Sequence, residues 1–253
     1  MKTTARFVPV VLLVGAGILA AAAPVAAKDL MLRKRTTASI DGKPAAPPRE
    51  SVEYITDGQN VVDDPTTRIL VDFSGSTYTL IEKEQKTYSV ATFGEIRKLI
   101  PDGEAGAGAN TSAEPGFEPT GKTGKIAGYE AREFALAAPP MRATVWTSEG
   151  LEKPRQMDEW RKLATNRGAP AGPGAVLAAA MADLTAVPLR LTLEVDVGER
   201  KMVTSTEVVE VSDAAPPAAM LRVPEGFKKV PSPLLKPPPS AAAPKKGPAT
   251  HAP

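Results

Sequence analysis

One short segment of the sequence matches a pattern that binds nucleotide phosphates. Residues Gly116 to Thr123 read GFEPTGKT, which fits G-x-x-x-x-G-K-[ST]. A working phosphate loop follows a buried strand and opens a helix, whose first N–H groups face the phosphates. Here a Gly-Ala stretch precedes the motif, strand-like alternation follows it, Pro119 lacks an N–H, and Glu118 would oppose a phosphate. We therefore interpret the match as accidental and expect no nucleotide binding.

Carboxylates are the other residues whose types suit chemistry. The chain has no cysteine and one histidine, His251, in the C-terminal tail, so Cys–His metal sites and a positioned catalytic imidazole are excluded. Candidates for a calcium site or a two-carboxylate hydrolase are Asp63, Asp64, Glu82, Glu84, Glu207 and Glu210. No Asp-rich loop has calcium spacing, so we expect solvated acids, no metal or cofactor, and no enzyme.

The N-terminus has the pattern of a secretory signal peptide. Lys2 and Arg6 precede an uncharged run from Phe7 to Ala27, which ends in small residues before Lys28. We expect removal of residues 1–27 and a periplasmic or secreted location. An uncleaved membrane anchor is the alternative, because the run is almost long enough to span a bilayer.

The charge of the chain argues against nucleic acid as a partner. The formal charge is +2, and loss of Lys2 and Arg6 with the leader brings it to zero, without the basic footprint of a nucleic-acid-binding protein. The tail, residues 231–253, is rich in proline and lysine, so we expect it to be disordered. A basic tail of this kind is also a candidate for contact with an anionic envelope surface.

Alternating apolar residues predict an antiparallel sheet with one buried face. The expected strands cover residues 51–56, 67–73, 77–91, 125–136, 141–148, 188–198 and 201–212, and the third is a hairpin that turns at Glu84 and Gln85. Residues 101–116 form a Gly-Ala insert with little to pack. A single domain is therefore expected over residues 28–230.

Three helices are expected beside the sheet. Thr92 to Glu95 form a capping-box pattern that begins the first. The second covers residues 154–165, where Met157 and Trp160 begin an apolar face that ends near Gly168, and the third covers residues 173–184 and is apolar nearly all round. The last two are predicted to lie as a pair on the sheet. Residues placed to line a cleft between sheet and helices are Trp146, Trp160, Leu177, Met181 and Leu193, although each tryptophan also suits a core position.

Six segments follow one another along the chain: KTYSV (86–90), TGKTGKIAGYEAREF (120–134), VWTSEGL (145–151), VPLRL (187–191), STEVVEVS (205–212) and LRVPEGFKKV (221–230). In their order and spacing they resemble an uncharacterised periplasmic family, catalogued as domain of unknown function 4412, in the wider group that includes the lipoprotein carrier LolA and the lipid-binding LppX. The resemblance covers residues 30–230. It implies a mainly β, curved and incompletely closed antiparallel sheet, a LolA-like half-barrel with helices on its concave face, and no catalytic residue.

Two functional hypotheses follow, and a third is weaker. The first is a non-enzymatic envelope protein that binds an acyl chain, a lipid or a lipidated partner in the sheet–helix cleft. The second is a structural or protein-interaction module with a filled core. The third is a carboxylate-dependent hydrolase.

Overall fold

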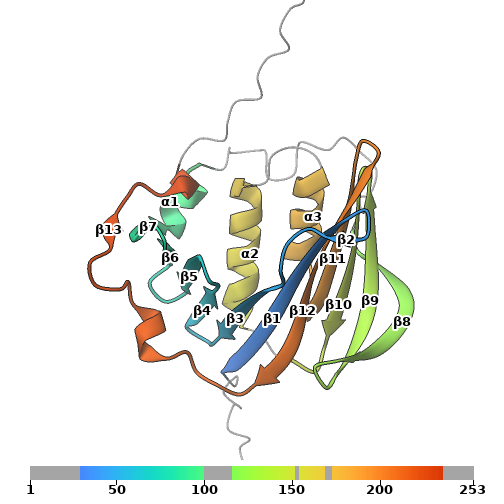
Figure 1. Ribbon diagram of the computed structural model, residues 1–253. Coiled ribbons are helices and arrows are strands. Elements are labelled where there is room, and N and C mark those ends of the chain that lie inside the picture. The colour runs from blue at the N-terminus through green and yellow to red at the C-terminus, as the bar shows by residue number, and fades with distance from the viewer. Residues whose placement is uncertain (1–28, 100–115, 152–153, 169–172, 236–253) are drawn as a thin grey trace, which may run out of the picture.

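The computed structural model describes residues 29–99, 116–151, 154–168 and 173–235, and most of these residues form strands of one sheet (Figure 1). The strands are β1 (Leu30–Ile40), β2 (Lys43–Pro44), β3 (Arg49–Ile55), β4 (Gln59–Asp63), β5 (Thr67–Asp72), β6 (Thr77–Glu82), β7 (Thr87–Thr92), β8 (Glu118–Ile126), β9 (Tyr129–Ala138), β10 (Met141–Ser148), β11 (Val187–Val197), β12 (Arg200–Ser212) and β13 (Lys228–Lys229). The helices are α1 (Phe93–Arg97), α2 (Arg155–Gly168), α3 (Pro173–Ala182) and two 3-10 turns, η1 (Ala218–Leu221) and η2 (Pro233–Leu235).

The sheet is curved and open. Its order is β13-β7-β6-β5-β4-β3-β1-β12-β11-β10-β9-β8, with β2 paired only to β1, and all neighbours are antiparallel except β13 and β7. The edges β13 and β8 do not pair with each other. The sheet bends around α2 and α3, which lie on its concave face (Figure 1). The prediction of a mainly β fold, with an incompletely closed antiparallel sheet and a few helices in its concavity, is confirmed.

Local sequence explains the elements that were predicted. The β6–β7 hairpin turns at residues 83–86, as expected. Helix α1 begins with the predicted capping box: the Glu95 N–H donates to Thr92 Oγ1 at 3.1 Å, and the Thr92 N–H donates to Glu95 Oε2 at 2.8 Å. Helices α2 and α3 form at the expected positions and pack against each other. In the described part of the chain, no helix has the length and apolarity needed to cross a membrane.

The strand expected over residues 125–136 is wrong in detail, because it is a hairpin. Strand β8 ends at Ile126, Ala127 and Gly128 form a two-residue turn with φ of +48° and +88°, and β9 starts at Tyr129. Two consecutive positive φ values give the turn the handedness that suits a twisted hairpin. The apolar alternation continues on both sides of this turn, so the sequence pattern predicted one strand instead of two. Strands β1 and β4 were not predicted at all.

The core lies between the concave face and the helices. The main cluster includes Leu32, Val71, Met157 and Leu189. A second cluster joins Ala180 of α3 to β9 and β10. A third joins Ala91 and Ile96 to α2.

A C-terminal strap, residues 213–235, covers part of the other face. On β5, Ile69 and Val71 contact the core, so Arg68 and Leu70 point to the convex side. There Arg68 Nη1 donates to the carbonyl of Ala219 at 3.2 Å. The strap then pairs with β7 as β13 and ends where Leu234 and Leu235 pack on the third cluster. The packed chain thus continues beyond Pro231, where the disordered tail was expected to begin; residues 236–253 lie outside the described residues.

Candidate functional site

Helix α3 is apolar on all sides yet only partly covered. Its sequence is PGAVLAAAMA, and on it Ala180 and Ala182 are buried. Val176, Leu177 and Met181 are half-buried. A helix that is apolar all round is normally enclosed on every side. This one leaves the side chains of Val176, Leu177 and Met181 partly accessible.

The side chains on the concave face beneath α3 differ in size from strand to strand. On β11 the residues Leu191, Leu193 and Val195 face the helix and are half-buried. Directly opposite Leu193 on β12 is Thr204, and opposite Thr204 on β1 is Ala38. In this row the concave face therefore runs from the large Leu193 on β11 to the small Thr204 and Ala38 on β12 and β1, which are also half-buried.

Trp160 of α2 belongs to a separate aromatic stack. Its ring lies 5.2 Å from that of Tyr78 and 5.1 Å from that of Phe93, with interplanar angles of 25° and 20°. Burial raises the pKa of Tyr78 above its ordinary value. This stack joins the main cluster to the third cluster, so Trp160 holds α2 against β6 and α1.

Trp146 lies on the other face. Its neighbour Val145 is fully buried with the core, so alternation along β10 turns Trp146 to the convex side. There the ring lies against Gly124, and the Arg190 guanidinium lies 5.9 Å from its centroid, within range of a cation–π contact. Trp146 still packs against the edge of the main cluster.

Of the five residues predicted to line a cleft, the structure brings together those near α3. Leu177 and Leu193 contact the same cluster, and Met181 lies one turn after Leu177 on α3. Trp160 lies in the aromatic stack, and Trp146 faces away. A cavity of about 120 Å³ between η1 and strands β4 to β6 is lined by none of the five. It is smaller than the pockets of about 300–1,000 Å³ that hold small ligands.

A buried polar cluster on the concave face was missed by sequence reasoning. Lys34 of β1 and Glu53 of β3 form an ion pair, and Asn60 Nδ2 of β4 donates to Glu53 Oε1 at 2.8 Å. Burial acts to raise the pKa of Glu53, but the Lys34 charge, hydrogen bonds from Lys34 and Asn60, and the Arg161 charge more than offset it, so this pKa lies below its ordinary value. The only signal in the sequence was a charged or polar residue at an inward-facing position of each strand.

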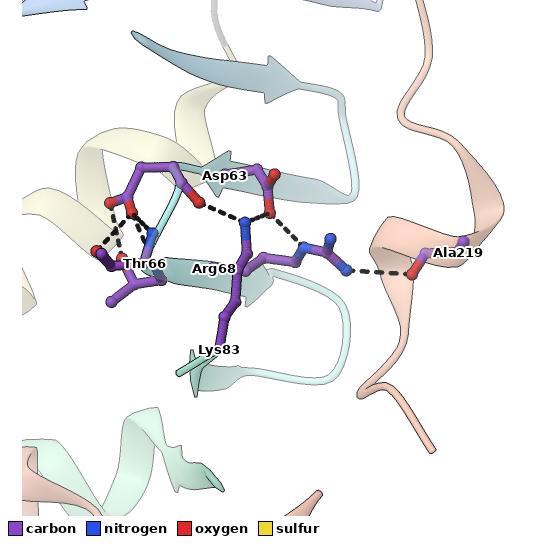
Figure 2. A network of polar contacts seen from close by, with 7 residues as sticks. Asp63, Thr66, Arg68, Lys83 and Ala219 are labelled. Carbon is purple, nitrogen blue, oxygen red and sulfur yellow. Dashed lines mark hydrogen bonds and ion pairs between the residues drawn. The ribbon is translucent and has the colours of Figure 1, made fainter. Parts of the chain in front are cut away.

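Asp63 and Asp64, two of the predicted acidic candidates, are engaged in structural contacts, and Figure 2 shows the network around Asp63. Asp63 Oδ1 accepts from Arg68 Nε at 2.6 Å and lies 3.0 Å from Lys83 Nζ. Asp64 Oδ1 accepts from the N–H groups of Thr66 and Thr67, both at 2.7 Å. Burial acts to raise the pKa of Asp64, but these hydrogen bonds and those of the two hydroxyls lower it overall.

The other acids are likewise spread over the sheet. Glu82 accepts a hydrogen bond from Thr87, while Glu207 pairs with Arg190 and Glu210 with Arg33. Within the described ranges, no three Asp, Glu or His side chains gather as a metal site would require. Asp63 is also less solvated than expected, with 18% of its side chain exposed.

The segment that matched the phosphate-loop pattern lies mostly within edge strand β8, and the hairpin to β9 follows it. Its Lys122 is a strand residue whose Nζ lies 2.8 Å from Glu133 Oε2. Thr120 Oγ1 also donates to that carboxylate, at 2.9 Å. The Lys122 hydrogen bond is the largest cause of a lowered pKa at Glu133. The lysine side chain therefore serves a cross-strand pair, and a strand stands where a phosphate loop would open a helix.

Comparisons with known proteins place the chain only distantly. No family model matches it, and no curated protein matches it. Two crystal forms of PNGF-II give TM-scores of 0.41 and 0.43 at 12% identity, covering 81% of this chain and 31% and 32% of PNGF-II.

Two further solved structures are similar at lower scores. MucB in complex with MucA(peri) gives a TM-score of 0.33 at 11% identity, covering 80% of this chain and 57% of that chain. A DUF1329 family protein from Desulfovibrio piger ATCC 29098 gives 0.24 at 10% identity, covering 78% and 90%. The chain thus spans about a third of PNGF-II and little more than half of MucB. These similarities are too distant to indicate a function.

Proposed function

We propose that this protein is a non-enzymatic envelope protein that holds an apolar ligand between α3 and the concave face of β11, β12 and β1. The ligand is an acyl chain, a lipid or a lipidated segment of a partner. The observation that carries the proposal is the incomplete covering of α3 among the described residues: Leu177 is only half-buried where it packs on the same cluster as the half-buried Leu193, and Met181, one turn later on the helix, is half-buried as well. Apolar surface that faces a concavity and is not closed by the protein itself is typical of ligand sites.

Family membership belongs to the same proposal. The ordered segments that resemble the periplasmic domain-of-unknown-function family support it, and so does the open sheet with helices in its concavity. Under this proposal the fold is a LolA-like half-barrel, and the concave face is the binding face.

A structural or protein-interaction module is the second candidate, and one observation favours it. The part of the concave face where β6, α1 and Trp160 of α2 meet is filled, since Ile96 is fully buried and Trp160 is stacked between two rings. If side chains close the α3 half in the same way in solution, no ligand binds there.

Replacing Leu177 with Ala separates the two candidates. We expect it to lower the free energy of unfolding by less than about 2 kcal/mol, because the side chain is only half-buried, and to weaken binding of dodecanol in a fluorescence titration. The matched control is Leu189→Ala, at a residue only 1% exposed, which should cost about 2–5 kcal/mol. Equal costs at both positions, with no dodecanol binding by the parent protein, would favour the structural module.

We also propose that the protein is exported and loses residues 1–27, which lie outside the described residues. The basic start, the apolar run and the small residues before Lys28 support this. N-terminal sequencing of the protein recovered from the envelope fraction should begin at Lys28, to within about two residues. Recovery of the intact Met1 terminus would instead support a membrane anchor.

A further inference from the structure

The buried polar cluster on the concave face contains more positive than negative charge. Lys34, Glu53 and Asn60 come from three neighbouring strands, and Arg161 comes from α2 above them. Arg161 lies close enough for its charge to act on Glu53. Two cations therefore share one carboxylate.

The hydrogen bonds of the cluster leave Arg161 incompletely paired. Glu53 Oε2 is bound to Lys34, and Glu53 Oε1 accepts from Asn60. Arg161 Nη1 is buried and has no hydrogen-bond partner among the described residues. Buried donors almost always have a partner, and a buried cation without one is strongly destabilising. An anion or a water molecule beside this nitrogen would accept the hydrogen bond that it otherwise lacks.

The position of Arg161 connects it to the proposed ligand site. Helix α2, which carries Arg161, packs directly against α3. Lys34, which contacts Glu53, is followed two residues later on the same face of β1 by Thr36 and then by Ala38, at the small-residue part of the concave face. An elongated molecule lying along β1 and α3 would present one end to Arg161.

We propose that Arg161 binds the anionic head group, a carboxylate or a phosphate, of the apolar molecule held beside α3. The planar guanidinium suits this role because it donates paired hydrogen bonds to either group. Glu53 holds the second cation, Lys34, so that Arg161 is the cation left for the ligand. This inference rests on the proposed function where it assumes that the ligand has an apolar chain beside α3. The anion site at Arg161 does not depend on that assumption.

Four probes of known chemistry test the head group and the chain separately. Laurate and dodecyl phosphate carry a chain and an anion, dodecanol carries the same chain without charge, and butyrate carries the anion with almost no chain. Binding of the three long-chain probes is followed by tryptophan fluorescence, since Trp160 adjoins Arg161 on α2 and its ring is stacked. Binding of butyrate is followed by the shift in the protein's melting temperature. Laurate should bind about tenfold more tightly than dodecanol, the effect of one charged hydrogen-bonded contact.

Arg161→Met should abolish that preference and leave dodecanol binding unchanged. Arg161→Lys keeps the charge and loses the planar guanidinium, so it should retain part of the preference for laurate over dodecanol. This variant also provides a second measurement if the methionine variant folds poorly. The matched control is Lys162→Met, which removes a charge from the next residue of α2 at an exposed position and should behave as the parent. Whichever of laurate and dodecyl phosphate binds more tightly identifies the head group.

The outcomes separate the two proposals. Equal binding of laurate and dodecanol by the parent and by Arg161→Met would overturn the head-group site while leaving the apolar site in place. A third outcome is that butyrate stabilises the parent but not Arg161→Met, while no long-chain probe binds. That result would support the anion site and overturn the proposed function. No response to any of the four probes would overturn both.

Discussion

Replacing Glu53 with Gln is expected to lower the free energy of unfolding by about 3–5 kcal/mol, the usual cost of removing one partner from a buried ion pair. Only 11% of the Glu53 side chain and 20% of the Lys34 side chain are exposed. The amide keeps the shape and can still bond Asn60, but it removes the charge that pairs with Lys34 and that Arg161 also acts on. Urea denaturation followed by circular dichroism measures the loss.

Glu50→Gln is the matched control, three residues before Glu53 on the same strand. Glu50 pairs with Arg35, and more than half of each side chain is exposed. An exposed pair of this kind contributes about 0–1 kcal/mol, so this variant should stay close to the parent. A Glu53→Gln protein as stable as the Glu50→Gln protein would show that the buried pair contributes little.

The same carboxylate predicts a dependence of stability on pH. Because the pKa of Glu53 is lower in the folded protein than its ordinary value of 4.5, its contribution is fully present above that ordinary value. It is lost as the pH falls through the lowered pKa, where the folded protein takes up the proton. The part of the acid destabilisation that comes from Glu53 should be absent in Glu53→Gln.

Removing the end of the C-terminal strap is expected to have the second-largest effect. A chain that ends at Val230 should be less stable by about 2–3 kcal/mol than a chain that ends at Leu235. Leu234 and Leu235 are half-buried against Ile96 and Leu163, and full burial of one leucine contributes roughly 1.5–3 kcal/mol. The two denaturation curves, measured side by side, give the difference.

A double substitution tests whether the side chains cause this loss. Leu234→Ala with Leu235→Ala, made in the chain that ends at Leu235, should reproduce most of it without changing the length. If the chains ending at Val230 and Leu235 had identical denaturation midpoints, the residues that follow Val230 would contribute nothing to the free energy of unfolding.

Much of the candidate site depended on contacts that no local pattern records. The pair of helices and the apolar character of α3 were predictable, because periodicity and composition are properties of a short segment. That Leu177 and Leu193 share a cluster follows from the helix lying over β11. Residue type alone suggested either a cleft or a core position for Trp146, whereas the direction of its side chain is set by alternation with the buried neighbour Val145.

The sequence by itself determined the mainly β class, the β6–β7 hairpin, the capping box of α1 and the absence of a helix after GFEPTGKT. Each of these depends on residues within a few positions of one another, where alternation and capping act directly. Only the tertiary structure decided that β1 is a strand. Burial of its inward-facing Lys34 is tolerable because Glu53, nineteen positions away, supplies the opposite charge. In the same way, residues 232–235 became part of the fold only because the strap returns to α1 and α2, and a contact between distant segments leaves no mark in either segment alone.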